Sequence, residues 1–311
     1  MTRASEFDLI GKLFAPLATS PGAFGLKDDV AVVAPRAGHD LVTTTDAIVE
    51  GVDFFANDPP DTIAKKALRV NLSDLAAKGA EPAAYLLTLM LPEKVDRIFL
   101  ERFAAGLAED QKTFGVALLG GDMSSTPGPL AISVTAFGHV PAGQMVRRSG
   151  ARVGDLVFVT GTIGDSGAGL SLLRDRKREP SRLIERYRVP EPRVSFAAPV
   201  RSASASVDVS DGLLADLGHI AEGSGVRIVV EAETVPRSAE LIALWGDGGD
   251  AIVRAATAGD DYEIAFTAAA SVPDSRTSVT CIGRVELGTG IALLDADGRE
   301  IAVPRKGYSH F

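Results

Sequence analysis

The chain has 311 residues, of which 46 % are apolar, and a formal net charge of −9 at pH 7. That length suits one large or two ordinary α/β domains, and we expect two. The negative charge gives no global support for binding nucleic acid or an anionic membrane, although a local basic patch can still bind phosphate. Without an apolar run of about 18 residues or an N-terminal signal pattern, the sequence predicts a cytoplasmic protein.

The first half of the chain alternates predicted helices and strands. Apolar residues at helical spacing predict helices at 5–17, 59–78 and 96–114, the second of which ends at Gly79. Runs rich in β-branched residues predict strands at 29–35, 39–46, 83–91, 116–119 and 129–140. A glycine turn is expected directly after residue 119.

A polar, glycine-containing segment at 148–155 resembles a linker, after which a second α/β unit begins. Strands are predicted at 155–160, 204–208, 226–231, 260–268 and 278–287, with helices after the first two. The charged, proline-interrupted segment 172–193 indicates a surface excursion. Cys281, the single cysteine, lies in a predicted strand, where we expect a reduced and buried thiol.

Five groups of acids share one format, in which an apolar strand is followed by Asp and then by small or hydroxyl residues. They are Asp28 with Asp29, Asp46, Asp74, Asp122, and Asp208 with Asp211. Each alone fits a turn former or a helix cap, and Asp211 stands directly ahead of a predicted helix. Together they would raise one another's pKa unless cations neutralised them. We therefore expect Mg²⁺, shared with the phosphates of a nucleoside triphosphate.

Nearby hydroxyl groups would supply neutral oxygens to metal or phosphate, namely those of Thr44, Thr45, Ser124, Ser125 and Ser210. Phosphate also needs cations, and the candidates are Arg148 and the helical residues Lys65, Lys66 and Arg69, for which a solvated basic face is the alternative. The turn 161–170 carries regularly spaced glycines but matches neither the P-loop nor the dinucleotide fingerprint. Such a site favours phosphoryl transfer, in which metal spreads the charge and aligns donor with acceptor.

Eight segments, in order from about residue 6 to 311, resemble the thiamine-monophosphate kinase family, whose superfamily includes aminoimidazole ribonucleotide synthetase, selenophosphate synthetase and the hydrogenase-maturation dehydratase. The segments are KDDVAVV, TTTDAIVEGVDFF, KALRVNLSDLAAKGAEP, LLGGDMSST, RSGARVGDLVFVTGTIGDSGAGL, VDVSDGLLADLGHI, AGDDYEIAFT and KGYSHF.

This resemblance implies a two-domain, PurM-like α/β architecture of the α+β type. The N-terminal domain, 1–147, would bind ATP and Mg²⁺ and form a β-barrel at a dimer interface, and the C-terminal mixed α/β domain, 148–311, would close the nucleotide and substrate cleft. The implied reaction is direct, Mg²⁺-assisted transfer of the γ-phosphate of ATP to thiamine monophosphate, giving thiamine diphosphate without a phospho-enzyme. The implied partners are these two small molecules and a second copy of the chain, with no nucleic acid or membrane.

The resemblance also assigns residues. Magnesium positions are Asp29, Thr44, Thr45, Asp46, Asp74, Asp122, Asp208 and Asp211; ATP contacts are Gly121, Asp122, Arg148 and Ser210; and the thiamine end would meet Asp53, Asp260 and Tyr308. Of these, we expect Asp211 and Arg148 to act in catalysis.

Three departures from the family pattern stand out. Lys27 replaces a usual Gly, Asp53 a frequent His, and Asp260 a frequent Glu. An acid at either of the last two positions suits a cationic thiazolium ring. Tyr308 is either a stacking platform or a terminal anchor. Two rival functions stay open, an ATP-using synthetase with another acceptor and a non-catalytic nucleotide-binding dimer.

Overall fold

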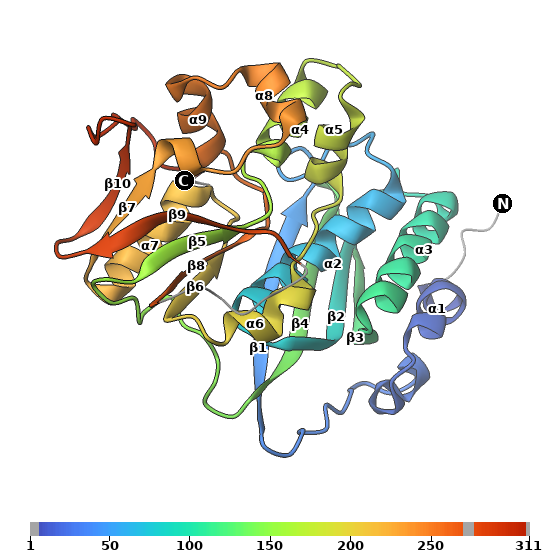
Figure 1. The fold of residues 1–311 in the computed structure, drawn as a ribbon. Coiled ribbons are helices and arrows are strands. Elements are labelled where there is room, and N and C mark those ends of the chain that lie inside the picture. The colour runs from blue at the N-terminus through green and yellow to red at the C-terminus, as the bar shows by residue number, and fades with distance from the viewer. Residues whose placement is uncertain (1–5, 270–276, 309–311) are drawn as a thin grey trace. The chain divides into compact units, whose positions relative to one another are not determined.

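The computed structural model describes residues 6–269 and 277–308 (Figure 1). The chain folds as two compact units, each with its own sheet. The first comprises Met1–Leu75 and Ala80–Gly143, and the second comprises Ala76–Gly79 and Gln144–Phe311. Within the described residues, no helix is both long and apolar enough to span a lipid bilayer.

The first unit is built on a four-stranded sheet with the order β1-β4-β2-β3. The strands are β1 His39–Val49, β2 Glu81–Leu91, β3 Ala117–Ser125 and β4 Ala131–Pro141. β4 pairs antiparallel with β1 and β2, whereas β2 and β3 are parallel. Along β4, Ile132, Val134 and Ala136 are buried and their neighbours half-buried, so the two faces of the sheet have different surroundings.

Helices α2 Pro60–Ala77 and α3 Arg97–Phe114 lie along one face of this sheet (Figure 1). They approach closely at Gly106, where a Cβ atom would lie 2.5 Å from the carbonyl oxygen of Asp61. Arg69 of α2 donates two hydrogen bonds of 2.7 Å to Asp110 of α3, and Lys65 pairs with Glu109. Lys65 and Arg69 are half-buried and join two helices, so a solvated basic face does not describe them, and their role in binding phosphate stays a prediction.

The segment before β1 differs from the prediction in two respects. The expected helix at 5–17 forms from Glu6 as three short pieces, α1 Glu6–Leu9, a π-helical turn Ile10–Phe14 and a 3₁₀ turn Ala15–Leu17; residue 5 lies outside the described residues. A further 3₁₀ segment covers Pro21–Leu26. The strand predicted at 29–35 is wrong, because Val32 donates its N–H to Gly22 in the preceding turn and Val30 is 66 % exposed.

The glycine turn predicted after residue 119 is also wrong, since β3 continues through both glycines to Ser125. The register against β2 shifts between Tyr85 and Leu86, which marks a bulge at this point. Gly121 has a φ of 156°, and a Cβ atom there would lie 1.7 Å from the Leu87 carbonyl oxygen. The glycines thus permit close approach of two strands and do not end one.

The second unit contains a six-stranded sheet with the order β10-β7-β9-β5-β8-β6. Its strands are β5 Leu156–Thr160, β6 Ala205–Asp208, β7 Arg227–Glu231, β8 Ile264–Ala268, β9 Val279–Glu286 and β10 Gly290–Leu294. Its helices are α4 Asp165–Arg174, α5 Ser181–Arg188, α6 Ala197–Val200, α7 Leu213–Ser224, α8 Ala239–Trp245 and α9 Gly249–Ala256, with 3₁₀ turns at Val194–Phe196 and Ala232–Thr234. Fully buried Val157, Leu217 and Ile228 belong to one core between sheet and α7.

Two predictions for this unit need correction. The segment 172–193 is exposed at 174–179, as expected of a surface excursion, but it also contains α5, whose Leu183, Ile184 and Tyr187 are buried because they share one face of the helix. Cys281 lies in β9 as predicted, but its thiol side chain is exposed. A central strand has two faces, and the sequence pattern did not show which one Cys281 occupies.

Candidate active site

Two of the predicted metal ligands point from β1 toward α2. Because side chains alternate along a strand, Thr44 and Asp46 share one face. The Thr44 hydroxyl donates a 2.6 Å hydrogen bond to Oδ2 of Asp74, and Asn71 Oδ1 accepts the backbone N–H of Asp46 at 3.1 Å. Strand and helix thus bring Thr44, Asp46 and Asp74 together across about 30 residues of sequence.

The charge in this group is not balanced by its nearest partners. Burial, followed by the neighbouring carboxylates of Asp74 and Asp53, raises the pKa of Asp46 from 3.8 to about 6. Binding of a cation would lower the free energy of this site, because the cation would offset the repulsion between the carboxylates.

Asp53, a predicted substrate contact, shapes the turn after β1. Its Oδ2 atom accepts the N–H of Val49 at 2.7 Å, and its carbonyl oxygen accepts a 2.8 Å hydrogen bond from Lys66 Nζ. Lys66 is only 2 % exposed, which excludes the solvated basic face for this residue. The buried ammonium group of Lys66 instead contacts the backbone of the turn that contains Asp53.

Thr45 faces the other side of the sheet, so the structure does not group it with Thr44. Its hydroxyl contacts the Val134 carbonyl at 3.1 Å and the Thr135 hydroxyl at 3.0 Å. On this side a cavity of about 750 Å³ is lined by Asp29, Gly121 and Asp122, together with Thr135 and apolar residues of β2 and β3. A cavity of this size can hold a nucleotide-sized ligand.

In the second unit, the loop between β6 and α7 gathers several predicted residues by backbone contacts. The carbonyl oxygen of Ser210 accepts the N–H of Asp260 at 2.8 Å, and that of Asp211 accepts the N–H of Tyr308 at 2.9 Å. Glycines precede both donors, and a Cβ atom at Gly259 or Gly307 would lie 2.6 Å or 2.5 Å from the same two carbonyl oxygens. The Tyr308 side chain is 49 % exposed, so its backbone anchors the segment while its ring stays accessible.

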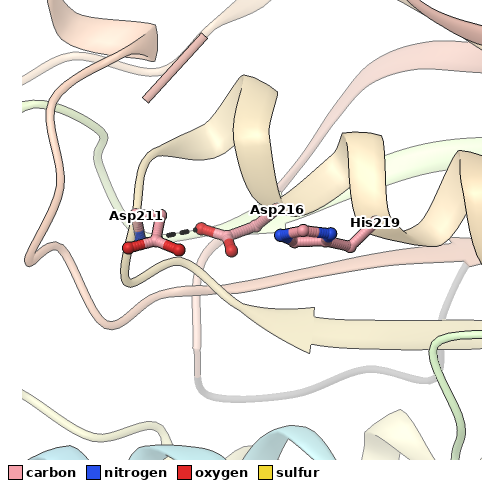
Figure 2. A group of neighbouring side chains, drawn as sticks. All are labelled: Asp211, Asp216 and His219. Atoms are coloured by element: carbon pink, nitrogen blue, oxygen red, sulfur yellow. Dashed lines mark hydrogen bonds between the residues drawn. The ribbon is translucent and has the colours of Figure 1, made fainter. Parts of the chain in front are cut away.

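Asp216, in the first turn of α7, was not singled out from the sequence. One of its oxygens, Oδ2, accepts the backbone N–H groups of Ser210, Asp211 and Gly212, each at 3.1 Å. Burial and the charge of Asp211 raise its pKa from 3.8 to about 7, although these hydrogen bonds oppose the shift. Figure 2 shows Asp211, Asp216 and His219 in a row, with one ligand atom from each within 4.8 Å of the others.

The predicted strand at 260–268 begins only at Ile264, because the segment before it is irregular. Asp260 and Tyr262 have positive φ angles of 67° and 52°, and the Tyr262 hydroxyl contacts Asp260 Oδ1 at 3.2 Å. Between them, the fully buried Asp261 accepts the N–H groups of Gly164 and Ser166 at 2.7 and 3.2 Å. Backbone strain of this kind, held by buried contacts, is typical of functional segments.

Two further predicted residues flank this region of the chain. Asp208 ends β6 and is 4 % exposed, and Arg148 is exposed in the segment before β5. Arg148 contributes its carbonyl oxygen to the Ser224 hydroxyl at 3.4 Å.

The donor atoms of both units suit Mg²⁺. Carboxylates and hydroxyls are the hard oxygen ligands that this ion prefers. Burial, followed by the charges of Asp74 and Asp53, raises the pKa of Asp46, and a bound cation would oppose this shift. The residues present therefore fit the metal that the sequence predicts.

Comparison with known proteins identifies the family. The chain matches the profile of the AIR synthase related protein N-terminal domain over residues 27–140 and that of the C-terminal domain over 152–293. A thiamine-monophosphate kinase of Caulobacter vibrioides is 42 % identical, with 98 % of this chain and 91 % of that protein covered.

Two solved structures are similar throughout. The thiamine-monophosphate kinase from Stenotrophomonas maltophilia has a TM-score of 0.80 and 40 % identity, covering 89 % of this chain and 91 % of that one. AaThiL complexed with AMPPCP and TMP has a TM-score of 0.80 and 37 % identity, covering 93 % and 97 %. These matches confirm the two-domain, PurM-like α/β fold. The chain therefore belongs to the AIR synthase related proteins and, among them, to the thiamine-monophosphate kinase family.

Proposed function

We infer that the chain carries out the reaction of its family, the ATP-dependent phosphorylation of thiamine monophosphate to thiamine diphosphate. The observation that carries this inference is the full-length similarity to thiamine-monophosphate kinases, together with the similarity to a structure holding AMPPCP and TMP. The reaction belongs to thiamine diphosphate biosynthesis.

We propose that each unit contributes carboxylates to binding Mg²⁺. In the first unit, Asp46 and Asp74 with Thr44 would serve on the face of the sheet toward α2, and Asp122 with Asp29 and Thr45 on the opposite face. In the second unit the ligands would be Asp208 and Asp211. When bound, the ion supplies charge neutralisation at the phosphates. Thr44 keeps the Asp74 carboxylate oriented through their hydrogen bond.

The remaining roles concern the two substrates. Gly121, Asp122 and Ser210 would contact ATP, and the Arg148 guanidinium would stabilise negative charge on its phosphates. Asp53, Asp260 and Tyr308 would bind the thiamine end, where a carboxylate suits a cationic ring. A phosphate oxygen of thiamine monophosphate attacks the γ-phosphorus, and the bond to the β-phosphate oxygen breaks with its electron pair leaving on ADP. The acceptor is already an anion, so no general base is required.

The test is turnover by the purified chain with ATP, MgCl₂ and thiamine monophosphate. We expect ADP and thiamine diphosphate in equal amounts, and no product at saturating substrates would refute the proposal. ATP made chiral at the γ-phosphorus should react with inversion, since one direct displacement inverts the centre. Retention would instead indicate a phospho-enzyme.

We further propose that the enzyme is a cytoplasmic homodimer, in which the first unit provides the dimer interface. Light scattering of the purified chain should give twice the mass of 32.4 kDa. Fractionation of the source cells should recover the activity with the cytosol.

A further inference from the structure

The backbone N–H groups of the loop Ser210–Gly212 all donate to one side chain, that of Asp216. Asp216 Oδ2 accepts all three successive N–H groups of the loop, each at 3.1 Å. Figure 2 shows the Asp216 carboxylate beside the backbone of Asp211. Three donors converging on one oxygen restrict the backbone more tightly than one capping hydrogen bond does.

A carboxylic acid at this position is costly for the fold. Asp216 is 1 % exposed and is followed by the fully buried Leu217. Moving a carboxylate out of water costs free energy that its hydrogen bonds must offset. An apolar residue would avoid this cost, which indicates that the acid serves the geometry of the loop.

The opposite side of the same loop carries residues assigned to substrate. The Ser210 and Asp211 carbonyl oxygens receive the N–H groups of Asp260 and Tyr308. A shift of the loop would therefore move Asp211, Asp260 and Tyr308 together, because the latter two are hydrogen-bonded to its carbonyl oxygens.

We propose that Asp216 is a positioning residue, which fixes the Ser210–Gly212 backbone and thereby aims the Asp211 carboxylate at the Mg²⁺–nucleotide. This proposal rests on the function proposed above. It requires the acceptor oxygen of Asp216 and not its negative charge, since a carbonyl-type oxygen accepts the same hydrogen bonds.

The rival interpretation is that Asp216 binds the metal directly, with Asp211 and His219. Their ligand atoms lie within 4.8 Å of one another. Two features favour positioning. Oδ2 of Asp216 is already the acceptor of three N–H groups, and Asp216 is buried whereas His219 is exposed.

The experiment compares four variants at Asp216 and His219 with a matched control. Asp216→Asn keeps an acceptor oxygen without the charge, Asp216→Glu keeps the charge but displaces the oxygens, Asp216→Ala removes both, and His219→Ala removes the third ligand atom. Asp155→Ala is the control, because Asp155 is also buried and accepts one backbone N–H, that of Arg152 at 2.9 Å.

Each protein is assayed for kcat, KM and the Mg²⁺ concentration giving half-maximal rate. Binding of AMPPCP with Mg²⁺ is measured by calorimetry, and thermal unfolding is recorded.

We expect Asp216→Ala and Asp216→Glu to lower kcat by about 100-fold and to weaken Mg²⁺–AMPPCP binding, as displacements of about 1 Å do. Asp216→Asn should stay within about threefold of the parent, because it still accepts hydrogen bonds. Asp155→Ala and His219→Ala should leave kcat and the Mg²⁺ requirement unchanged. If Asp216→Ala does not fold, the contrast between Asn and Glu decides.

Three outcomes would overturn the proposal. An Asn variant as impaired as the Glu or Ala variant would assign the role to charge. A changed metal requirement in His219→Ala would assign it to direct ligation, and equal loss in Asp155→Ala would make the effect merely structural. If the parent does not phosphorylate thiamine monophosphate, the proposed function fails, and the calorimetric comparison still tests Asp216.

Discussion

Asp46 in the first unit and Glu263 in the second are both acids withdrawn from solvent, yet their nearest charged neighbours have opposite signs. Around Asp46 stand Asp74 and Asp53, which raise its pKa. Glu263 is fully buried and accepts hydrogen bonds from Thr160, Arg186 and Arg193 at 2.7, 3.0 and 2.5 Å. Compensation of charge thus marks an acid that stabilises the fold, and a lack of it marks an acid suited to a cation.

The largest loss of stability is expected from removing Glu263, the acid whose charge is compensated. Glu263→Ala would leave two largely buried guanidinium groups, Arg186 and Arg193, without the buried carboxylate that they share. The free energy of unfolding, measured by urea denaturation, should fall by about 3–5 kcal/mol.

Glu191 provides the control for this variant, since it pairs with the same two arginines but is 62 % exposed. Glu191→Gln should cost less than about 1 kcal/mol. Equal losses in the two variants would show that burial of the pair is not what stabilises the second unit.

The uncompensated acids should respond to metal. Mg²⁺ at 100 times its Kd should raise the free energy of unfolding of the parent by about 2.7 kcal/mol. Thermal shift measurements on Asp46→Asn combined with Asp74→Asn should show most of this gain lost. Asp40→Asn changes an acid of the same strand that accepts the Gly143 N–H, and it should retain the gain. A double variant that responds to Mg²⁺ like the parent would remove these carboxylates from the proposed ligands.

Without metal, Asp46 is expected to lower the free energy of unfolding as the pH rises. This loss is smaller than the gain from Mg²⁺ binding. Its pKa of about 6 in the folded chain exceeds the ordinary 3.8, so the folded state binds the proton more tightly. Stability is therefore highest when Asp46 is protonated, and it falls as pH rises from about 4 to about 6.

Asp46→Asn removes this loss. In EDTA the variant should be more stable than the parent by roughly 1 kcal/mol at pH 8, after discounting for solvent screening, and equal to it near pH 4. Comparing the two proteins isolates Asp46 from Asp216, whose raised pKa acts with the same sign. Urea denaturation at both pH values gives the measurement. A difference that persists unchanged at pH 4 would contradict the electrostatic cause.

How much of this was predictable depends on the range of the interaction. The fold class was confirmed, and α2 and β1 were predicted near their observed bounds, because their apolar spacing and the stop at Gly79 are local signals. Thr44 and Thr45 were assigned to one site because they are adjacent to Asp46 in the sequence and match the family pattern, but strand alternation separates them.

Contacts between distant segments were not predictable from local patterns. Arg186, in α5, and Glu263, just before β8, are 77 residues apart. Neither residue alone indicates that the two segments pack together. Asp216 carried one usable signal, an acid in the first turn of a helix after a Ser-Asp-Gly loop. An acid in this position is usually explained by its favourable interaction with the helix dipole. The structure shows in addition that it accepts hydrogen bonds from three backbone N–H groups.

The smallest effect is expected at Cys281, where prediction and structure disagree about burial. Its thiol is exposed and lies 3.8 Å from the Gly283 carbonyl oxygen, so Cys281→Ser should change the free energy of unfolding by less than about 0.5 kcal/mol. A thiol reagent should modify the folded parent at the rate of an exposed cysteine. Gly283→Ala, in the same strand, gives the contrast: its Cβ atom would lie 1.9 Å from the Val229 carbonyl oxygen, and it should be strongly destabilising. A thiol that reacts only after unfolding would restore the buried assignment, because reaction requires solvent access.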